Sequence, residues 1–191
     1  MDHKVNLEWR RDIFHMAGIV IPVGYLLFPK ELVFWGIVLA SVVYVGSDLL
    51  RLFHKGFAHF FYKIVGDLVK DRERKNLIGS SYFLIGAFFC VLLFPKEAAL
   101  PALFVASVSD VAASFIGSRW GKHPLRGSRT LEGSLCFFLS ASFLILLFYP
   151  GPKVWGILVA FFSTLIEAFS FWVDDNLSLP LGTAFLLWLF L

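Results

Sequence analysis

The chain has 191 residues, of which 58% are hydrophobic and 16% are charged, with a mean hydropathy of +0.76. A soluble domain carries about 25% charged residues, so this composition argues against a soluble globular fold. Phenylalanine contributes 23 residues and tryptophan six, as in proteins whose side chains face lipid and its interfaces.

Seven apolar runs follow one another along the chain, at residues 13–28, 32–47, 77–94, 98–116, 133–149, 154–172 and 177–191. A membrane-spanning helix needs about 20 residues, so seven spans and their turns take up the whole chain. Proline in three of the connections favours tight turns between antiparallel helices. The sequence predicts an all-α integral membrane protein of about seven transmembrane helices, built as one membrane-embedded domain over residues 1–191.

Lysine and arginine are distributed unequally between the two ends of these runs. Fourteen lie at the N-terminus, in the long loop after the second run or in the loop after the fourth, and three lie in the opposite turns. Because cytoplasmic loops carry an excess of Lys and Arg, we expect a multi-pass protein with a cytoplasmic N-terminus and a C-terminus outside. Any active face on the cationic side is then cytoplasmic.

Residues 49–70 show a different pattern, with basic side chains at every fourth position and apolar side chains between them. Arg51, Lys55, His59 and Lys63 form the basic face. A helix with one basic and one wide apolar face lies along a membrane surface, where cations meet anionic headgroups. We expect one interfacial amphipathic helix here, with anchoring as its favoured role.

Asp110 lies within the fourth apolar run, about two helical turns before Gly117. An ionisable group at mid-membrane costs roughly 2.5–3.5 kcal/mol on insertion scales, so a cation, a metal ion or a water-filled cavity must offset that cost. Asp110 is therefore a candidate metal ligand and catalytic residue. A structural hydrogen bond between helices is the simpler alternative.

The loop after the fourth run combines cations, glycines and the start of the fifth run. Glycines let backbone N–H groups approach an anion, and a helix N-terminus presents unpaired N–H groups to phosphate. This pattern predicts a polyphosphate site, while ordinary cytoplasmic loop charge would also place cations here. The candidate nucleotide-binding residues are Gly117, Arg119, Gly121, Lys122, Arg129, Gly133 and Ser134, and Glu132 is a catalytic candidate that would orient the loop or bind metal.

Two further acidic positions need partners. Glu167 lies inside the sixth run, and Asp174, Asp175 and Asn176 follow its cytoplasmic end. Adjacent carboxylates suit Mg²⁺, which binds through one or two carboxylates and substrate phosphates. Together with Asp110, Asp174 and Asp175 are the expected metal ligands. Asn176 is expected to support them, and a solvated acidic loop is the alternative.

Polar residues also precede the first and third runs. Arg11 and His15 share one helix face, and His15 is a candidate to accept a hydroxyl proton, to contact phosphate or to lie at the interface. Glu73 and Asn76 form a second pair three residues apart. We expect supporting roles for Arg11, Glu73 and Asn76.

Taken together, these segments resemble the CTP-dependent lipid kinases, the family of dolichol kinase, phytol kinase and yeast-type diacylglycerol kinase. The blocks that carry the resemblance run across nearly the whole chain in the family's order. They are Glu8-x-Arg10-Arg11 with His15, residues 73–79, Ser109-Asp110-x-Ala112-Ala113, Gly117-x₃-Gly121-Lys122, residues 131–134, and Asp174-Asp175-Asn176. Ser109 stands where the family has Gly, and Arg129 stands where it has Lys, which keeps the charge but changes its geometry.

The resemblance implies transfer of the γ-phosphate of CTP to the hydroxyl of a membrane lipid alcohol, such as a polyprenol, a phytol-type alcohol or diacylglycerol. CTP, the lipid alcohol and the bilayer are the expected partners, Mg²⁺ is the expected cofactor, and no nucleic acid is expected. A cytidylyltransferase that acts on a lipid phosphate is one alternative. A small transporter that uses Asp110 and Glu167 as coupling groups is another, although the outer turns offer it few charged residues.

Overall fold

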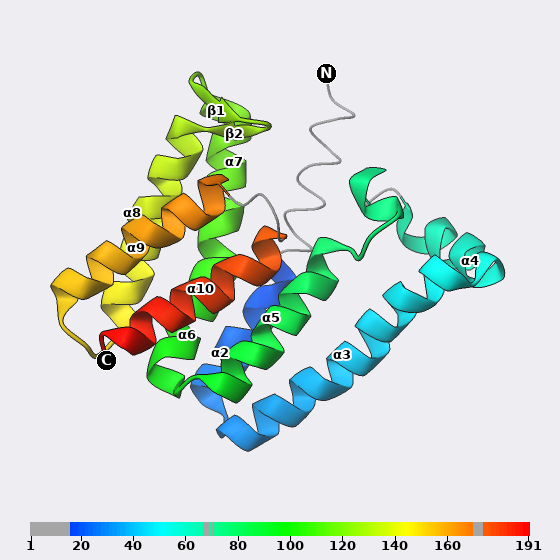
Figure 1. The fold of residues 1–191 in the computed structure, drawn as a ribbon, viewed down its shortest axis with the longest axis horizontal. Helices are drawn as coiled ribbons and strands as arrows, with labels where there is room; N and C mark the ends of the chain where they lie inside the picture. The colour runs from blue at the N-terminus through cyan, green and yellow to red at the C-terminus, as the bar shows by residue number, and fades with distance from the viewer. Residues whose placement is uncertain (1–15, 67–68, 70, 170–173) are drawn as a thin grey trace.

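The computed structural model describes residues 16–66, 69, 71–169 and 174–191, and most of them are helical (Figure 1). The helical elements are η1 (Ala17–Ile19), α2 (Val20–Leu27), α3 (Lys30–Phe53), α4 (Lys55–Val65), η3 (Asp71–Arg74), α5 (Gly79–Leu93), α6 (Lys96–Phe104), the π-helical turn η4 (Val105–Ser109), α7 (Asp110–Trp120), α8 (Leu131–Phe148), α9 (Lys153–Phe169) and α10 (Asp175–Leu189).

Two short strands, β1 (Pro124–Arg126) and β2 (Arg129–Thr130), depart from the all-helical expectation. They pair antiparallel in the connection from α7 to α8. Gly127 has a φ of 58°, which lies in the left-handed region that glycine enters without steric cost, so it closes the hairpin turn.

Each predicted apolar run contains one helical segment, and the proline-containing connections are tight turns as predicted. Pro29 and Pro95 directly precede α3 and α6. Because proline lacks a backbone N–H, it fits best just before or at the first turn of a helix. α6, η4 and α7 are continuous and form one helical segment over Lys96–Trp120.

Within the described residues, three helical segments are long and apolar enough to cross a membrane: Lys30–Phe53, Lys96–Trp120 and Leu131–Phe148. The helices Ala17–Leu27 and Gly79–Leu93 are apolar but shorter. Along α8, side chains at every fourth position from Leu135 to Leu147 are 56–66% exposed and apolar. An outward apolar stripe suits contact with lipid, and the fold is that of an all-α membrane protein.

The helices pack as a bundle in which α10 contacts α5, α6 and α9, while α8 contacts α7 and α9 (Figure 1). A buried core of Val105, Phe137, Ile145 and other residues joins these helices. Buried Ser163 of α9 and Thr183 of α10 share a hydrogen bond of 2.8 Å. Apolar side chains outside and a hydrogen-bonded polar pair inside are what a membrane solvent favours.

The amphipathic helix begins later than predicted. α3 continues to Phe53, and α4 starts at Lys55 because the extended backbone of His54 ends α3. The His54 Nδ1 accepts a hydrogen bond from the N–H of Phe57 and so caps α4. Arg51 therefore belongs to α3, where it is 3% exposed, and its assignment to the basic surface of the amphipathic helix is wrong.

Candidate active site

Three glycines bring the hairpin and α8 close to α7. A Cβ atom on Gly121 would lie 2.5 Å from Thr130 Cγ2, and one on Gly117 would lie 3.0 Å from Thr130 Oγ1. A Cβ atom on Gly133 would lie 2.9 Å from the carbonyl oxygen of Ala113 in α7. Close packing is thus a sufficient reason for glycine at these positions, and their expected contact with phosphate stays a prediction.

The start of α8 is already hydrogen-bonded to the hairpin. Thr130 Oγ1 accepts from the N–H of Gly133 at 3.2 Å, and the His123 carbonyl accepts from the N–H of Leu131 at 2.9 Å. Glu132 Oε1 lies 2.7 Å from His123 Nδ1, so Glu132 holds the hairpin as expected of a loop-orienting residue. The expectation that this helix start offers unpaired N–H groups to phosphate is wrong for Leu131 and Gly133.

Arg129 of β2 joins α9 to α10. Its Nε forms an ion pair with Glu167 Oε1 of α9 at 2.8 Å, and its Nη2 donates a hydrogen bond to Asp175 Oδ2 at the start of α10. Asp110 and Asp175 both lie close enough to Glu167 to repel its negative charge. Arg129 therefore pairs with two carboxylates, and Asp110 lies near one of them, Glu167. We call these four residues the Arg129 cluster.

Asp110 is half-buried and directly follows the π-helical turn η4. A π-turn inserts an extra residue and so changes the register between α6 and α7; such turns are frequent at functional sites. The hydroxyl of Ser107 donates to the carbonyl of Leu103 at 2.8 Å inside this irregular segment. Asp110 is thus a charged residue next to a break in regular α-helical geometry, within a long apolar helical segment.

Asp174 and Asp175 are held together by Asn176. The Asn176 Nδ2 donates to Asp174 Oδ1 at 2.7 Å and to Asp175 Oδ1 at 3.2 Å. Asp174 also caps α10 by accepting from the backbone N–H of Asn176. Burial raises the pKa of Asp174 above its ordinary value, and the hydrogen bonds from Asn176 oppose that change.

The Asp174–Asp175 pair lies deeper in the bundle than the start of the neighbouring helix α5. Gly86 of α5 approaches the Asn176 backbone so closely that a Cβ atom would lie 3.2 Å from the Asn176 carbonyl oxygen. Gly86 is seven residues into α5, which corresponds to about 10 Å along the helix axis at 1.5 Å per residue. The start of α10 is therefore recessed into the bundle.

The expected magnesium ligands do not form a preassembled cage. Among the described residues, no group of three or more His, Cys, Asp and Glu side chains is arranged to hold a metal ion. Mg²⁺ bound to a nucleotide uses only one or two carboxylates and takes its other ligands from water and phosphate. The Asp174–Asp175 pair fits that requirement, and the contribution of Asp110 stays a prediction.

The other nucleotide-binding candidates include two exposed cations and one buried serine. Arg119 and Lys122 are exposed at and after the end of α7, and neither forms an ion pair within the described part of the chain. The guanidinium of Arg119 stacks over the Phe115 ring at 3.9 Å. Ser134 is buried in α8, and its hydroxyl has no hydrogen-bond partner among the described residues. Arg11 and His15 lie outside the described residues.

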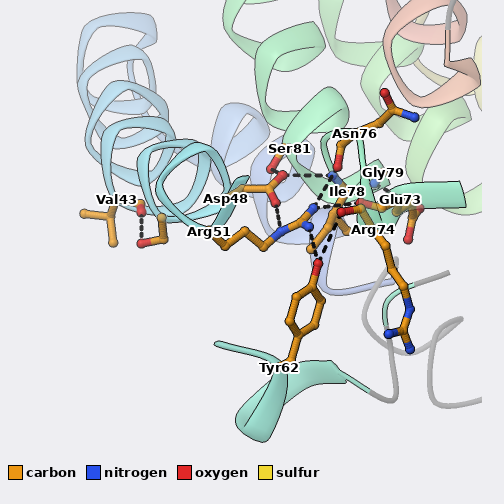
Figure 2. A network of polar contacts seen from close by, with 11 residues as sticks. Val43, Asp48, Arg51, Tyr62, Glu73, Arg74, Asn76, Ile78, Gly79 and Ser81 are labelled. Atoms are coloured by element: carbon orange, nitrogen blue, oxygen red, sulfur yellow. Dashed lines mark hydrogen bonds and ion pairs between the residues drawn. The ribbon is translucent and has the colours of Figure 1, made fainter. Parts of the chain in front are cut away.

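A second buried polar group, which we call the Arg51 clamp, fastens the segment before α5. Figure 2 shows Arg51 of α3 between Asp48, Tyr62 of α4 and the segment that carries Glu73 and Asn76. Arg51 Nε donates to Asp48 Oδ1 at 2.6 Å, and its Nη1 donates to the Tyr62 hydroxyl at 2.7 Å. Its Nη2 donates to the backbone carbonyls of Glu73 and Asn76.

Asp48 completes the Arg51 clamp on the α5 side. Its Oδ2 accepts from the N–H of Ile78 at 2.8 Å and from the Ser81 hydroxyl at 2.6 Å. Glu73 Oε1 accepts from the N–H of Gly79, the first residue of α5. Glu73 and Asn76 thus take part in the structural attachment of this segment, and their supporting roles at the active site stay predictions. Asp48 was not singled out from the sequence and Arg51 was placed on the amphipathic helix, although their spacing of three residues on one helix was an available signal.

No family model matches the chain, and no solved structure matches it. An uncharacterized protein of Methanocaldococcus jannaschii is 34% identical over 185 residues, which cover 94% of this chain and 91% of that protein. The CTP-dependent diacylglycerol kinase 1 of Schizosaccharomyces pombe is 29% identical over 161 residues, which cover 75% of this chain and 74% of that kinase. The dolichol kinase of the same yeast is 28% identical over 195 residues, covering 92% of this chain and 38% of the kinase.

The fold is that of a membrane protein, and the relatives define the class of enzyme. The chain belongs to the family of CTP-dependent lipid kinases, which includes diacylglycerol, phytol and dolichol kinases. It is a phosphotransferase of this family. The resemblance inferred from the sequence blocks is therefore confirmed.

Proposed function

We propose that this protein transfers the γ-phosphate of CTP to the hydroxyl group of a membrane lipid alcohol. The observation that carries the proposal is the Arg129 cluster, which gathers one arginine and three carboxylates inside a bundle with an apolar outer surface. A water-soluble donor and a lipid acceptor can meet where such a charged site opens toward both water and lipid. The named relatives, a diacylglycerol kinase and a dolichol kinase, support this chemistry.

Phosphoryl transfer depends mainly on positioning and charge neutralisation, which the charged residues of this chain can supply. Arg129 holds the triphosphate from the hairpin, and Arg119 and Lys122 attract it from the exposed end of α7. Asp110 or His15 accepts the proton of the acceptor hydroxyl. The remaining nucleotide-binding candidates are Gly117, Gly121, Gly133 and Ser134, and Glu132 keeps their loop in place.

Asp174 and Asp175 are the proposed ligands of Mg²⁺, with Asp110 as a further ligand and Asn176 holding the pair. A bound Mg²⁺ would neutralise charge on the donor phosphates. The adjacency of Asp174 and Asp175 supports this assignment, because Mg²⁺ bound with a nucleotide uses one or two carboxylates and takes its other ligands from phosphate and water. The Asn176 hydrogen bonds keep the two carboxylates adjacent before any ion arrives.

We further propose that seven spans cross the bilayer, with the N-terminus and the active face in the cytoplasm and the C-terminus outside. The unequal distribution of Lys and Arg supports this orientation. α4 then lies along the cytoplasmic interface. Its exposed Phe60 and Ile64 are 59% and 64% accessible and would enter the headgroup region, while Lys55 and Lys63 would meet anionic lipid.

The deciding experiment measures phosphate transfer by the purified protein in lipid nanodiscs. γ-Labelled CTP and ATP are supplied separately with Mg²⁺ and a panel that contains polyprenol, phytol and diacylglycerol. Label that appears in one lipid with CTP, and is lost in Asp110→Asn, would support the proposal and identify the acceptor. Transfer from ATP and not from CTP would refute the assigned donor.

Product analysis separates this proposal from a cytidylyltransferase. That enzyme would release pyrophosphate from CTP when it is given a lipid phosphate, and it would leave no γ-label in any lipid alcohol. Pyrophosphate release under those conditions would therefore overturn the kinase assignment.

A further inference from the structure

Glu167 is the most deeply buried acid of the Arg129 cluster, at 5% exposure. Its Oε1 forms an ion pair with the Nε of Arg129 at 2.8 Å, while its Oε2 is buried and has no hydrogen-bond partner among the described residues. A buried ion pair is weak evidence for stability, because apolar residues of similar volume often replace such a pair without loss. A half-satisfied carboxylate in an apolar helix therefore calls for a role other than stabilisation.

The guanidinium of Arg129 is held on two of its three nitrogen atoms. The Nε pairs with Glu167 of α9, and the Nη2 donates a hydrogen bond to Asp175 of α10. The Nη1 has no hydrogen-bond partner within the described part of the chain. Because the guanidinium is planar, two fixed contacts from different helices also fix the direction of the third nitrogen. The Arg129 side chain is 22% exposed, so it remains accessible to a ligand.

We infer that Glu167 is a positioning residue that orients Arg129 so that the Nη1 edge of its guanidinium faces the phosphates of the nucleotide donor. This inference rests on the proposed function and adds to it a residue that never touches the substrate. Glu167 acts through the orientation of one arginine, and a polyphosphate is the ligand that this edge would bind. A planar guanidinium binds phosphate best when its edge points at the ligand, whereas a compact ammonium needs no such orientation.

Glu167 can be tested separately from the proposed metal ligands. Its one ion-pair partner within the described residues is Arg129, whereas Asp175 contacts both Arg129 and Asn176. Substitution of Glu167 therefore weakens the hold on Arg129 and leaves the Asp174–Asp175 pair chemically intact. Glu167→Gln keeps the shape of the side chain and replaces a charged acceptor with a weaker neutral one, so the guanidinium is held less firmly.

The experiment compares wild type, Glu167→Gln, Arg129→Lys and the double variant, all purified in nanodiscs with Mg²⁺. Binding of a non-hydrolysable CTP analogue and of inorganic tripolyphosphate is measured by titration calorimetry. The KM for CTP and kcat are measured in parallel. Ser163→Ala is the matched control, because it removes the hydrogen bond between α9 and α10 without touching Arg129.

We expect Glu167→Gln to weaken binding of both probes and to raise the KM for CTP about tenfold, the effect of roughly 1.4 kcal/mol of lost binding energy. The kcat should change less than threefold, since the residue contributes to holding the donor. The double variant should bind no more weakly than Arg129→Lys, because the two residues act as one unit. Ser163→Ala should lower the melting temperature and leave binding of both probes unchanged.

Additive losses in the double variant, or equal losses in Glu167→Gln and Ser163→Ala, would overturn the inference and leave Glu167 as a structural residue. Tripolyphosphate separates this inference from the proposed function. If wild type binds tripolyphosphate and Glu167→Gln binds it more weakly, but no label moves from CTP to a lipid, the kinase proposal fails and the positioning role stands. If wild type binds neither probe, both are refuted.

Discussion

Gly86 of α5 and Pro180 of α10 lie so close together that a Cβ atom on Gly86 would be 3.0 Å from the Pro180 ring. The same atom would be 3.2 Å from the carbonyl oxygen of Asn176. This contact determines how near α10 comes to α5, and hence where the Asp174–Asp175 pair lies within the bundle. A side chain at position 86 must move the start of α10.

Gly86→Val tests that relationship. Overpacking of a tight contact typically costs 1–3 kcal/mol, so we expect a lower melting temperature and roughly a tenfold or greater loss of kcat, as Asp174 and Asp175 shift. Gly36→Val on α3 is the control, because nothing lies within 4 Å of a Cβ atom there. Thermal unfolding in detergent and the transfer assay measure the two effects. Full activity in Gly86→Val would show that the position of α10 is unimportant.

If the Arg51 clamp holds the segment before α5, substitutions in it should lower the free energy of unfolding by different amounts. Asp48→Ala leaves the buried guanidinium of Arg51 without its carboxylate, and loss of one partner of a buried ion pair costs about 3–5 kcal/mol. Ser81→Ala removes one hydrogen bond to the same carboxylate and should cost about 1 kcal/mol. Differential scanning fluorimetry of the two purified variants compares these effects. If Asp48→Ala were no less stable than Ser81→Ala, the clamp would not hold the segment before α5.

Removal of metal should abolish activity. With EDTA we expect no phosphate transfer, and added Mg²⁺ should restore it. Asp174→Asn should raise the Mg²⁺ concentration for half-maximal rate about tenfold, because one of two carboxylates is lost from the proposed site. Glu31→Gln, an exposed substitution in the first turn of α3, should leave the Mg²⁺ dependence unchanged. An unaltered Mg²⁺ dependence in Asp174→Asn would remove that residue from the set of metal ligands.

The proposed orientation can be tested by cysteine labelling in sealed vesicles. The background carries Cys90→Ala and Cys136→Ala, which replace both native cysteines. Leu125→Cys in the hairpin should react with a membrane-impermeant maleimide only from the cytoplasmic side, and Glu97→Cys in the first turn of α6 should react only from the other side. Labelling of both positions from one side would contradict the seven-span topology.

Much of the site could be anticipated from residue types and their order. Asp110 stood out because a charge inside an apolar run must be compensated, and Asp174 with Asp175 stood out as an acidic pair beside a cationic face. The pairing of Arg129 with Glu167 and Asp175 could not be predicted, because nothing in the local sequence says which of several cations meets which acid. The same holds for Gly117 and Gly133, whose packing role depends on the approach of two separate helices.

The sequence by itself determined the class of protein and the positions of its helices. Long apolar runs bounded by proline specify helices locally, because in lipid every backbone polar group must be satisfied within its own segment. The tertiary structure alone decided that Arg51 is buried, that the start of α8 is already capped and that Arg129 bridges α9 and α10. Those features depend on contacts between residues far apart in the chain, and their energies are set by the distance and burial that packing creates.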